Sequence, residues 1–553
     1  MAQLSLSAAQ FSTQSAKDGG MDKAMAPSSP AAQFLDLPNE VVLLILGHPD
    51  LPSEALLYLS MLCRRLHHLS LSIYFDIYGL SDPTQNANII MRDSRLDPLS
   101  ALQMALFIPS VVELSCSLPH YETSIRPLFP HIRRLRACIG RLAFIRKVTL
   151  ALDEPNSSRH SAAEEGVDTW TLEFGGLLNT ILQRGCTSLT LRYGTFYSDV
   201  FEPRPTSSRL VVKPVHALRN VVRHILPDVP PGSGWDFLLN AGTSMEFDLQ
   251  GHSTSALTHL KIESSMLLLP PCVGWTLSTL QHSPITTLEF VGITLPTRIW
   301  STVLPFIPNL VPALTELNLS ILSGISGLDV LLLIAKLPRL KILTIGYTEY
   351  SRLIQSACPD SGPIPKLLEL THLNAPSTFI RHFLRKNSMP SLTALCISPR
   401  RPIISSGLRL RHILGPVSEI LRRLEKYNLA PVLSLELQCG RGSDAEMAAD
   451  LTGPAPGEDI IQALRAITRL IVCSHFEMAA PELGTLARWI ARFPNLVHVS
   501  LRVRSAVEAT FDDARAISEQ NPNVVSLELN GKLFDARNIP KPKPPEIPPY
   551  IGV

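Results

Sequence analysis

The most regular feature of the chain is an apolar pattern with the spacing Leu-x-x-Leu-x-Leu, which recurs from about residue 100 onward. The fourth and sixth positions of each copy alternate as in a short β-strand, so their side chains are expected on one buried face. Three weaker copies come first, and ten clear copies follow. The weaker copies are Val111-Leu114-Cys116, Ile145-Val148-Leu150 and Cys186-Leu189-Leu191. The clear copies are Leu257-Leu260-Ile262, Ile285-Leu288-Phe290, Leu314-Leu317-Leu319, Leu340-Leu343-Ile345, Leu370-Leu373-Ala375, Leu392-Leu395-Ile397, Val432-Leu435-Leu437, Ile467-Leu470-Val472, Leu496-Val499-Leu501 and Val524-Leu527-Leu529.

Segments between these copies have helical periodicity. One runs from Leu483 to Phe493, and another contains Ile380 and Phe383 after Ser377, which we expect to be an N-cap. Proline stops a helix because it lacks a backbone donor and clashes with the preceding turn. Five prolines stand two residues before a copy, namely Pro312, Pro338, Pro390, Pro494 and Pro522. The pattern therefore predicts parallel strands joined by helices through right-handed crossovers.

This α/β pattern resembles the leucine-rich-repeat family. The family usually has Asn or Cys shortly after the third leucine, whereas this chain has residues such as Ser265, Leu322 and Thr348 there. We therefore expect an irregular leucine-rich-repeat solenoid with parallel strands and covering helices. The alternative is a generic α/β sheet whose strands are rich in leucine.

A short leucine-rich segment precedes the repeats. Pro38 and Glu40 suit the first turn of a helix that must end before Pro49. A second helix is predicted from Ser53, carrying Leu56, Leu59, Leu62 and Leu66. So few residues cannot bury this much leucine by themselves, so a partner, the repeats or both must cover the remaining apolar face.

The run Leu37-Pro38-x-Glu40-Val41 and the later Cys63-Arg64-Arg65-Leu66 resemble an F-box. This resemblance implies docking on a Skp1-like adaptor and, through it, a cullin-based ubiquitin ligase, with the repeats binding an unknown protein client. The implied adaptor-facing or motif-core residues are Leu37, Pro38, Val41, Ile45, Leu46, Leu59, Cys63 and Leu66. Pro49 departs from the family, which normally has a leucine there. The alternative is a protein-interaction scaffold without a ligase role, in which these helices only cap the first repeat.

The chain is expected to have four parts. These are a disordered tail at 1–33, the F-box helical motif at 34–80, a repeat solenoid at 81–535 and a proline-rich tail at 536–553. Four insertions rich in Pro, Gly, Ser or charge predict surface loops. They are Leu152–Asp168, Tyr197–Val215, Pro227–Gly234 and Cys439–Glu458.

Charge and cysteine usage restrict the class of partner. Lysine and arginine number 50 against 48 acidic residues, so the net charge of +2 favours neither nucleic acid nor a membrane surface as partner. The arginines from Arg133 to Arg146 are expected on a solvated helix face. Nine cysteines without a Cys-x-x-Cys pair, and no signal-like or membrane-spanning segment, predict a cytoplasmic and/or nuclear protein.

The sequence contains none of the common catalytic signatures, among them Gly-x-Ser-x-Gly, the phosphate loop and His-Glu-x-x-His. Adjacent carboxylates such as Glu164-Glu165 lie in polar stretches, where solvation is expected rather than acid–base catalysis. We therefore predict a binding protein that needs no cofactor or metal, not an enzyme.

Overall fold

The computed structural model describes fourteen stretches of the chain. They are residues 37–91, 97–119, 126–152, 167–194, 245–249, 254–269, 271–346, 365–385, 389–398, 410–439, 443–453, 456–474, 480–503 and 511–536. Both predicted tails lie outside them, apart from Ala536. Contacts divide the chain into two compact units, Met1–Tyr74 and Phe75–Val553, and each is described by itself.

The first unit is helical. It contains α1 (Asn39–Leu46), α2 (Ser53–Ser60) and most of α3 (Arg64–Ile77). Pro38 and Pro52 occupy the N-cap positions of α1 and α2, and the first helix ends before Pro49 as predicted.

The prediction of one continuous helix from Ser53 to Leu66 was wrong. The chain turns at Met61 and Leu62, whose backbone N–H groups donate to the carbonyls three residues earlier. Cys63 then starts α3 by accepting a hydrogen bond at Sγ from the Leu66 N–H at 3.5 Å. The i→i+3 bonds and this thiol satisfy groups that a broken helix leaves unpaired.

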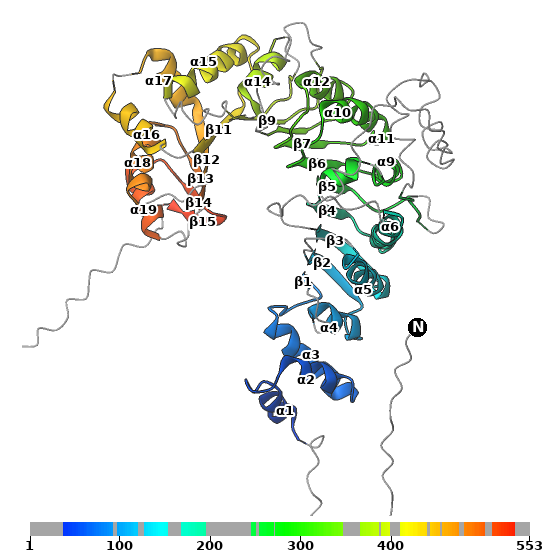
Figure 1. Cartoon of the computed structure of the whole chain (residues 1–553). Coiled ribbons are helices and arrows are strands. Elements are labelled where there is room, and N and C mark those ends of the chain that lie inside the picture. The colour runs from blue at the N-terminus through cyan, green and yellow to red at the C-terminus, as the bar shows by residue number, and fades with distance from the viewer. Residues whose placement is uncertain are drawn as a thin grey trace, which may run out of the picture. The chain divides into compact units, whose positions relative to one another are not determined.

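The second unit is built on one fifteen-stranded sheet whose strands follow each other in chain order (Figure 1). All neighbouring strands are parallel except the last pair, β14 and β15. The strands are β1 (Asn86–Ile90), β2 (Ser110–Ser117), β3 (Phe144–Ala151), β4 (Ser188–Arg192), β5 (His259–Glu263), β6 (Thr287–Val291), β7 (Glu316–Ser320), β8 (Ile342–Ile345), β9 (His372–Pro376), β10 (Ala394–Ser398), β11 (Val432–Cys439), β12 (Ile467–Ser474), β13 (His498–Val503), β14 (Ser526–Leu529) and β15 (Lys532–Asp535).

The fourth and sixth residues of every predicted copy lie on a strand, from β2 to β14, and their side chains are buried, whereas the first residue of most copies lies just before the strand. The register aligns equivalent positions. Leu260 pairs with Leu189 on one side and with Leu288 on the other, and Leu317 continues the same row. This succession of parallel strands and helices is a leucine-rich-repeat architecture, and the predicted α/β fold class is confirmed. The strands β1 and β15, which close the two ends of the sheet, were not predicted.

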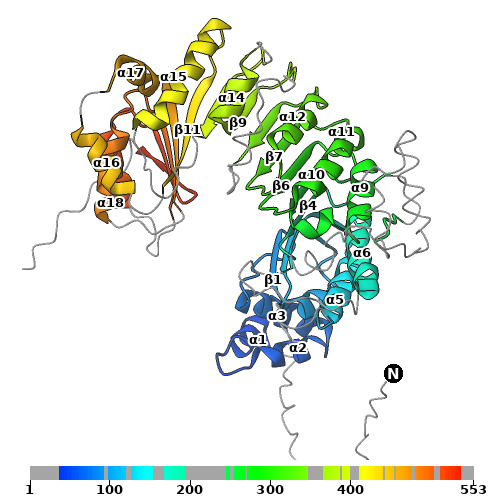
Figure 2. The same ribbon diagram turned by 45° about the horizontal axis from the view of Figure 1, so that its top comes forward.

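Helices cover one face of the sheet (Figures 1 and 2). They are α4 (Pro98–Met104), α5 (Leu128–Arg141), α6 (Val167–Gln183), η3 (Ser265–Leu268), α9 (Val273–Gln281), α10 (Thr297–Val303), η4 (Leu304–Phe306), α11 (Ile307–Leu310), α12 (Gly327–Ala335), α14 (Ser377–Phe383), α15 (Leu410–Lys426), α16 (Ser443–Thr452), α17 (Glu458–Ala466), α18 (Ala480–Ile490) and α19 (Phe511–Gln520). The core between helices and sheet includes four fully buried tryptophans, Trp170, Trp275, Trp300 and Trp489.

The five phased prolines lie in the turns between a helix and the following strand, as predicted. The predicted N-cap at Ser377 was wrong. Pro376 occupies the N-cap of α14, Ser377 is the first helical residue, and no side chain caps the helix.

One predicted loop was also wrong. Part of the insertion Cys439–Glu458 forms α16, a helix with three alanines and a buried Met447 that packs near α18. Alanine has the highest helix propensity, which outweighs the loop character of the flanking Gly and Pro. The insertions Tyr197–Val215 and Pro227–Gly234 lie outside the described residues, as does most of Leu152–Asp168.

The prediction of a solvated arginine face on α5 is confirmed only in part, because Arg134 and Arg141 are half-buried and contact α4. Arg134 donates to Asp97, the N-cap of α4, at 2.6 Å, and the Asp97 side chain is completely buried. Arg141 donates to the carbonyls of Leu102 and Ala105, at the end of α4. A cation near the carbonyl end of a helix is favourable, so this arginine joins successive repeats. Arg133 and Arg136 remain exposed.

Candidate partner-binding surfaces

The helical unit has an apolar surface that its own core does not use. Val42 and Leu46 of α1 are buried, while Val41, Leu44 and Ile45 are exposed, and Leu44 is 76% exposed. Residues separated by three and four positions share one side of a helix, so these three form a stripe. Three more exposed apolar side chains, Tyr58, Met61 and Leu62, belong to the end of α2 and the turn after it. We call these six residues the apolar surface of the helical unit.

The eight residues predicted from the F-box resemblance do not share one environment. Leu46 and Leu66 are buried in the core. Pro38, Val41 and Ile45 are exposed, whereas Leu37, Leu59 and Cys63 are half-buried. Only the exposed and half-buried members can contact a partner without the helices separating.

Arg65 holds the start of α1 in place. Its Nε donates to Asn39 Oδ1 at 2.8 Å, and its Nη2 donates to the Leu37 carbonyl. His67 lies beside the end of α2, with Nδ1 3.0 Å from the Ser60 carbonyl oxygen. These polar contacts join the three helices and fix the position of the apolar stripe on α1.

Sequence reasoning did not select Leu44, Tyr58, Met61 and Leu62 as site residues. The signal for Leu44 was available, because it follows Val41 by three residues and precedes Ile45 on the same side of the helix. The exposure of Met61 and Leu62 had no such signal, since it depends on the break between α2 and α3.

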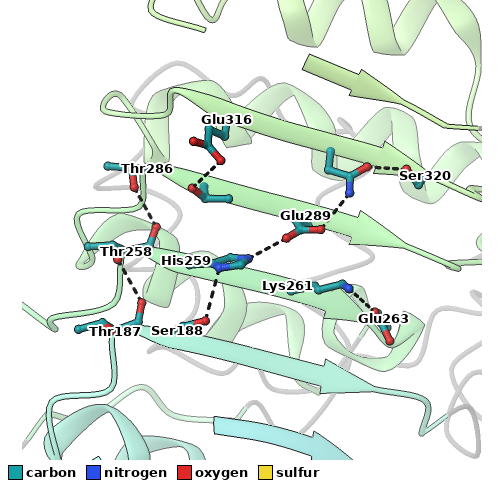
Figure 3. A network of polar contacts seen from close by, with 12 residues as sticks. Thr187, Ser188, Thr258, His259, Lys261, Glu263, Thr286, Glu289, Glu316 and Ser320 are labelled. Carbon is teal, nitrogen blue, oxygen red and sulfur yellow. Dashed lines mark hydrogen bonds and ion pairs between the residues drawn. The ribbon is translucent and has the colours of Figure 1, made fainter. Parts of the chain in front are cut away.

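A second candidate surface is the face of the sheet opposite the helices, which we call the open face. Strand residues that alternate with the buried ones are partly exposed here, as in β5, β6 and β7. Polar side chains predominate across these strands (Figure 3).

A chain of polar contacts crosses the open face diagonally from β4 to β7 (Figure 3). Ser188 Oγ lies 3.4 Å from His259 Nδ1, and His259 Nε2 lies 2.8 Å from Glu289 Oε1. Asn318 Nδ2 donates to Glu289 Oε2 at 2.9 Å, and Ser320 donates to Asn318 Oδ1 at 2.5 Å. Hydrogen bonds from His259 and Asn318, with the nearby charge of Lys261, hold the pKa of Glu289 below its ordinary value.

An ion-pair cluster lies beside this chain of contacts. The Glu263 carboxylate forms ion pairs with two cations. Lys261 Nζ lies 2.7 Å from Oε1, and Arg192 Nε lies 3.0 Å from Oε2. These three side chains carry a net charge of +1, and Glu289, whose pKa the charge of Lys261 helps to lower, adds a second carboxylate beside them.

Buried thiols offer no reactive nucleophile. Burial raises the pKa of Cys138, Cys186, Cys272 and Cys439 to about 12, so these cysteines stay protonated near neutral pH. Within the described ranges, no group of three or more His, Cys, Asp and Glu side chains could hold a metal ion. Among the same residues, no helix combines the length and apolar character needed to cross a bilayer.

No protein-family profile and no curated protein matches the sequence. Among solved structures, the leucine-rich repeat-containing protein LegL7 from Legionella pneumophila is similar over 48% of this chain and 83% of its own length. The identity is 18% and the TM-score is 0.28. Because this TM-score is low, the leucine-rich-repeat architecture is inferred from the strand order, the register and the leucine positions of this chain.

Proposed function

We propose that the chain is the substrate-recognition adaptor of a Skp1–cullin–F-box type ubiquitin ligase. The helical unit docks on a Skp1-like protein, and the repeat sheet binds a protein client that other subunits modify. The observation that carries this proposal is the exposure of six large apolar side chains, Val41, Leu44, Ile45, Tyr58, Met61 and Leu62, on a small helical unit.

The energetics favour a protein partner for this surface. Large apolar side chains that lie together on an exposed surface mark interaction sites, and Val41, Leu44 and Ile45 lie together on one side of α1. Burying a leucine or isoleucine side chain completely is worth about 1.5–3 kcal/mol. A micromolar Kd corresponds to a binding free energy of about 8 kcal/mol. Burial of the stripe on α1 by a partner would therefore supply a substantial part of that free energy.

The repeat sheet suits the second half of the proposal. A parallel sheet whose open face carries half-exposed polar side chains offers a broad, rigid surface to another protein. The mixture of Lys, Arg, His and Glu on β4 to β7 has no excess of one sign large enough for a nucleic acid.

The experiment is a pull-down of the full-length protein with a purified Skp1-like adaptor, beside the double variant Leu44→Gln, Ile45→Gln. Both side chains are exposed, so the variant is expected to fold, and circular dichroism checks this. The control is Leu172→Gln on α6, which removes a leucine of the repeat unit that is 69% exposed, between Ile45 at 45% and Leu44 at 76%.

Binding by the wild type and the control, with loss in the double variant, supports the adaptor role. Equal binding by all three proteins places the contact elsewhere and contradicts the proposed surface. If none of them binds, the alternative of a leucine-rich-repeat scaffold without a ligase role replaces the proposal.

A further inference from the structure

Ile321, the residue after β7, has a backbone conformation that its side chain disfavours. Its φ is +56°, in the left-handed region, where a β-branched residue is a genuine outlier. The preceding repeat has Gly292 at the equivalent position after β6, with φ +68°. Glycine adopts this conformation without a steric penalty, so the turn itself calls for glycine rather than isoleucine.

The surrounding hydrogen bonds impose this turn. Ser323 N–H donates to the Ile293 carbonyl at 2.9 Å, and Trp300 Nε1 donates to the Ser323 carbonyl at 2.9 Å. Gly292 N–H donates to the Ser320 carbonyl at 3.0 Å. Strained residues persist where their surroundings determine the backbone in this way, and such residues concentrate at functional sites.

Burial does not explain why isoleucine occupies the turn, because Ile321 is 50% exposed. The isoleucine side chain destabilises the turn, and its apolar surface remains half exposed to water. Contact with another molecule would bury that apolar surface and so be favourable. Its strand neighbour Ser320 ends the diagonal chain of polar contacts, which places Ile321 at the edge of the open face.

Two other strands end at this edge with Arg192 and Glu263, and Lys261, in the middle of β5, reaches Glu263 with its Nζ. Arg192 pairs in register with Glu263, and Val291 pairs with Ser320. Tyr193, directly after β4, is a second residue other than glycine with positive φ, at +61°. We call Arg192, Tyr193, Lys261, Val291, Ser320 and Ile321 the carboxyl-end rim.

We propose that the carboxyl-end rim binds an extended segment of the client that combines an apolar side chain with an acidic one. The apolar side chain packs on Ile321, and the carboxylate approaches Arg192 and Lys261, where two cations share the single carboxylate of Glu263. This inference deepens the proposed function and rests on its premise that the repeats bind a client.

The strand spacing sets the separation of the two side chains in the client. Neighbouring strands lie about 4.8 Å apart, so β5 and β4 lie about 10 and 14 Å from β7. An extended chain rises about 3.3 Å per residue, which separates the apolar and the acidic residue by three or four positions.

A phage-displayed library of random dodecapeptides tests this on the full-length protein, with counter-selection on the Ile321→Asn variant. Asparagine tolerates positive φ, so this variant loses the apolar side chain while the turn is retained. The expected result is enrichment of peptides with a large apolar residue three or four positions from Asp or Glu. No enrichment over the variant, or enrichment of Lys and Arg, overturns the proposal.

A synthetic peptide of the enriched sequence is then titrated by fluorescence anisotropy. Ile321→Asn and the pair Arg192→Gln, Lys261→Gln should each raise the Kd about tenfold or more, as for residues central to an interface. The control Leu332→Ala on α12 removes a leucine that is 45% exposed on the helical side and should change the Kd less than about twofold. An equal loss in the control, or none in the rim variants, contradicts the rim as the site.

No Skp1-like protein takes part in these measurements. A negative result in the rim experiment therefore does not contradict adaptor docking. A negative result in the adaptor pull-down does not contradict peptide binding at the rim.

Discussion

The hydroxyl of Thr286 donates to the backbone carbonyl oxygen of Thr258, one repeat earlier, across 3.3 Å. The same contact recurs between Thr258 and Thr187 (Figure 3) and between Thr315 and Thr286. In each case the carbonyl also accepts two backbone N–H groups, for instance those of Thr286 and Thr287 at the Thr258 carbonyl. A row of threonine hydroxyls thus joins consecutive repeats directly before their strands.

Replacing Thr286 by valine tests this threonine row. The variant keeps the shape of the side chain but loses one inter-repeat hydrogen bond, so the free energy of unfolding should fall by about 0.5–1.5 kcal/mol. Urea unfolding followed by circular dichroism measures the change. The control is Thr302→Val, whose hydroxyl donates to the Arg298 carbonyl within the same helix, so its loss should change stability less. Equal effects at the two positions would show that the row does not stabilise the stack.

The turns after β6 and β7 place Gly292 and Ile321 at equivalent positions with positive φ, so substitutions there test the cost of backbone strain. Ile321→Asn should raise the free energy of unfolding by about 1 kcal/mol, because it relieves a β-branched residue at positive φ. Gly292→Ala should lower it by about 1 kcal/mol. A Cβ at Gly292 meets nothing within 4 Å, so the cost there is conformational rather than steric. Thermal unfolding of both variants checks the opposite signs, and destabilisation by Ile321→Asn would mean that the isoleucine side chain stabilises the turn.

The buried pair of Asp97 and Arg134 should be essential to the first repeats. Arg134→Met removes the cation that pairs with the fully buried Asp97 carboxylate. The free energy of unfolding should therefore fall by about 3 kcal/mol. Arg133 is the matched control, because it pairs with Glu173 at 2.6 Å but is 58% exposed. Solvent screening should limit the cost of Arg133→Ala to less than about 1 kcal/mol. Similar losses at both positions would contradict the structural role of the buried pair.

The diagonal contacts at Glu289 predict a pH dependence of stability. The folded pKa of Glu289 lies below its ordinary value of 4.5, so its contribution is complete above about pH 4.5 and is lost as the pH falls through the folded pKa. Glu289→Gln should be less stable than the wild type at pH 7, and the difference should shrink as the pH falls below about 4.5. Urea midpoints at pH 7, 5 and 3.5 measure this. A constant difference across that range would show that the carboxylate has no preferential contacts in the folded state.

Much of the repeat unit could be predicted from residue order alone. Alternation at Leu260 and Ile262, with equivalents in every copy, specifies which strand residues face the core, because side chains alternate between the two faces of a strand. Pro338 and its counterparts mark where helices end, because proline lacks a backbone donor and clashes with the preceding turn. Pro416, which lies inside α15, is an exception. The helix from Asn39 that ends before Pro49 was predictable for the same local reason.

Features that depend on neighbouring repeats could not be predicted in this way. The arginine pattern of α5 is the same whether Arg134 faces water or the buried Asp97, and only the position of α4 decides between them. Threonine after the first leucine of a copy was visible in the sequence. Its acceptor, however, is a carbonyl of another repeat, which lies 71 residues away for Thr258.

The candidate sites likewise combine features that the sequence determined with features that only the tertiary structure decided. The sequence alone determined that the first helices carry more leucine than they can bury, that thirteen copies of one apolar pattern form a parallel sheet, and where most turns occur. Tertiary structure decided that Leu46 and Leu66 belong to the core while Leu44 and Met61 face solvent, and that Ile321 is held at positive φ. The physical reason is that periodicity sets the direction of a side chain within its own element, whereas exposure and strain depend on which other elements pack against it.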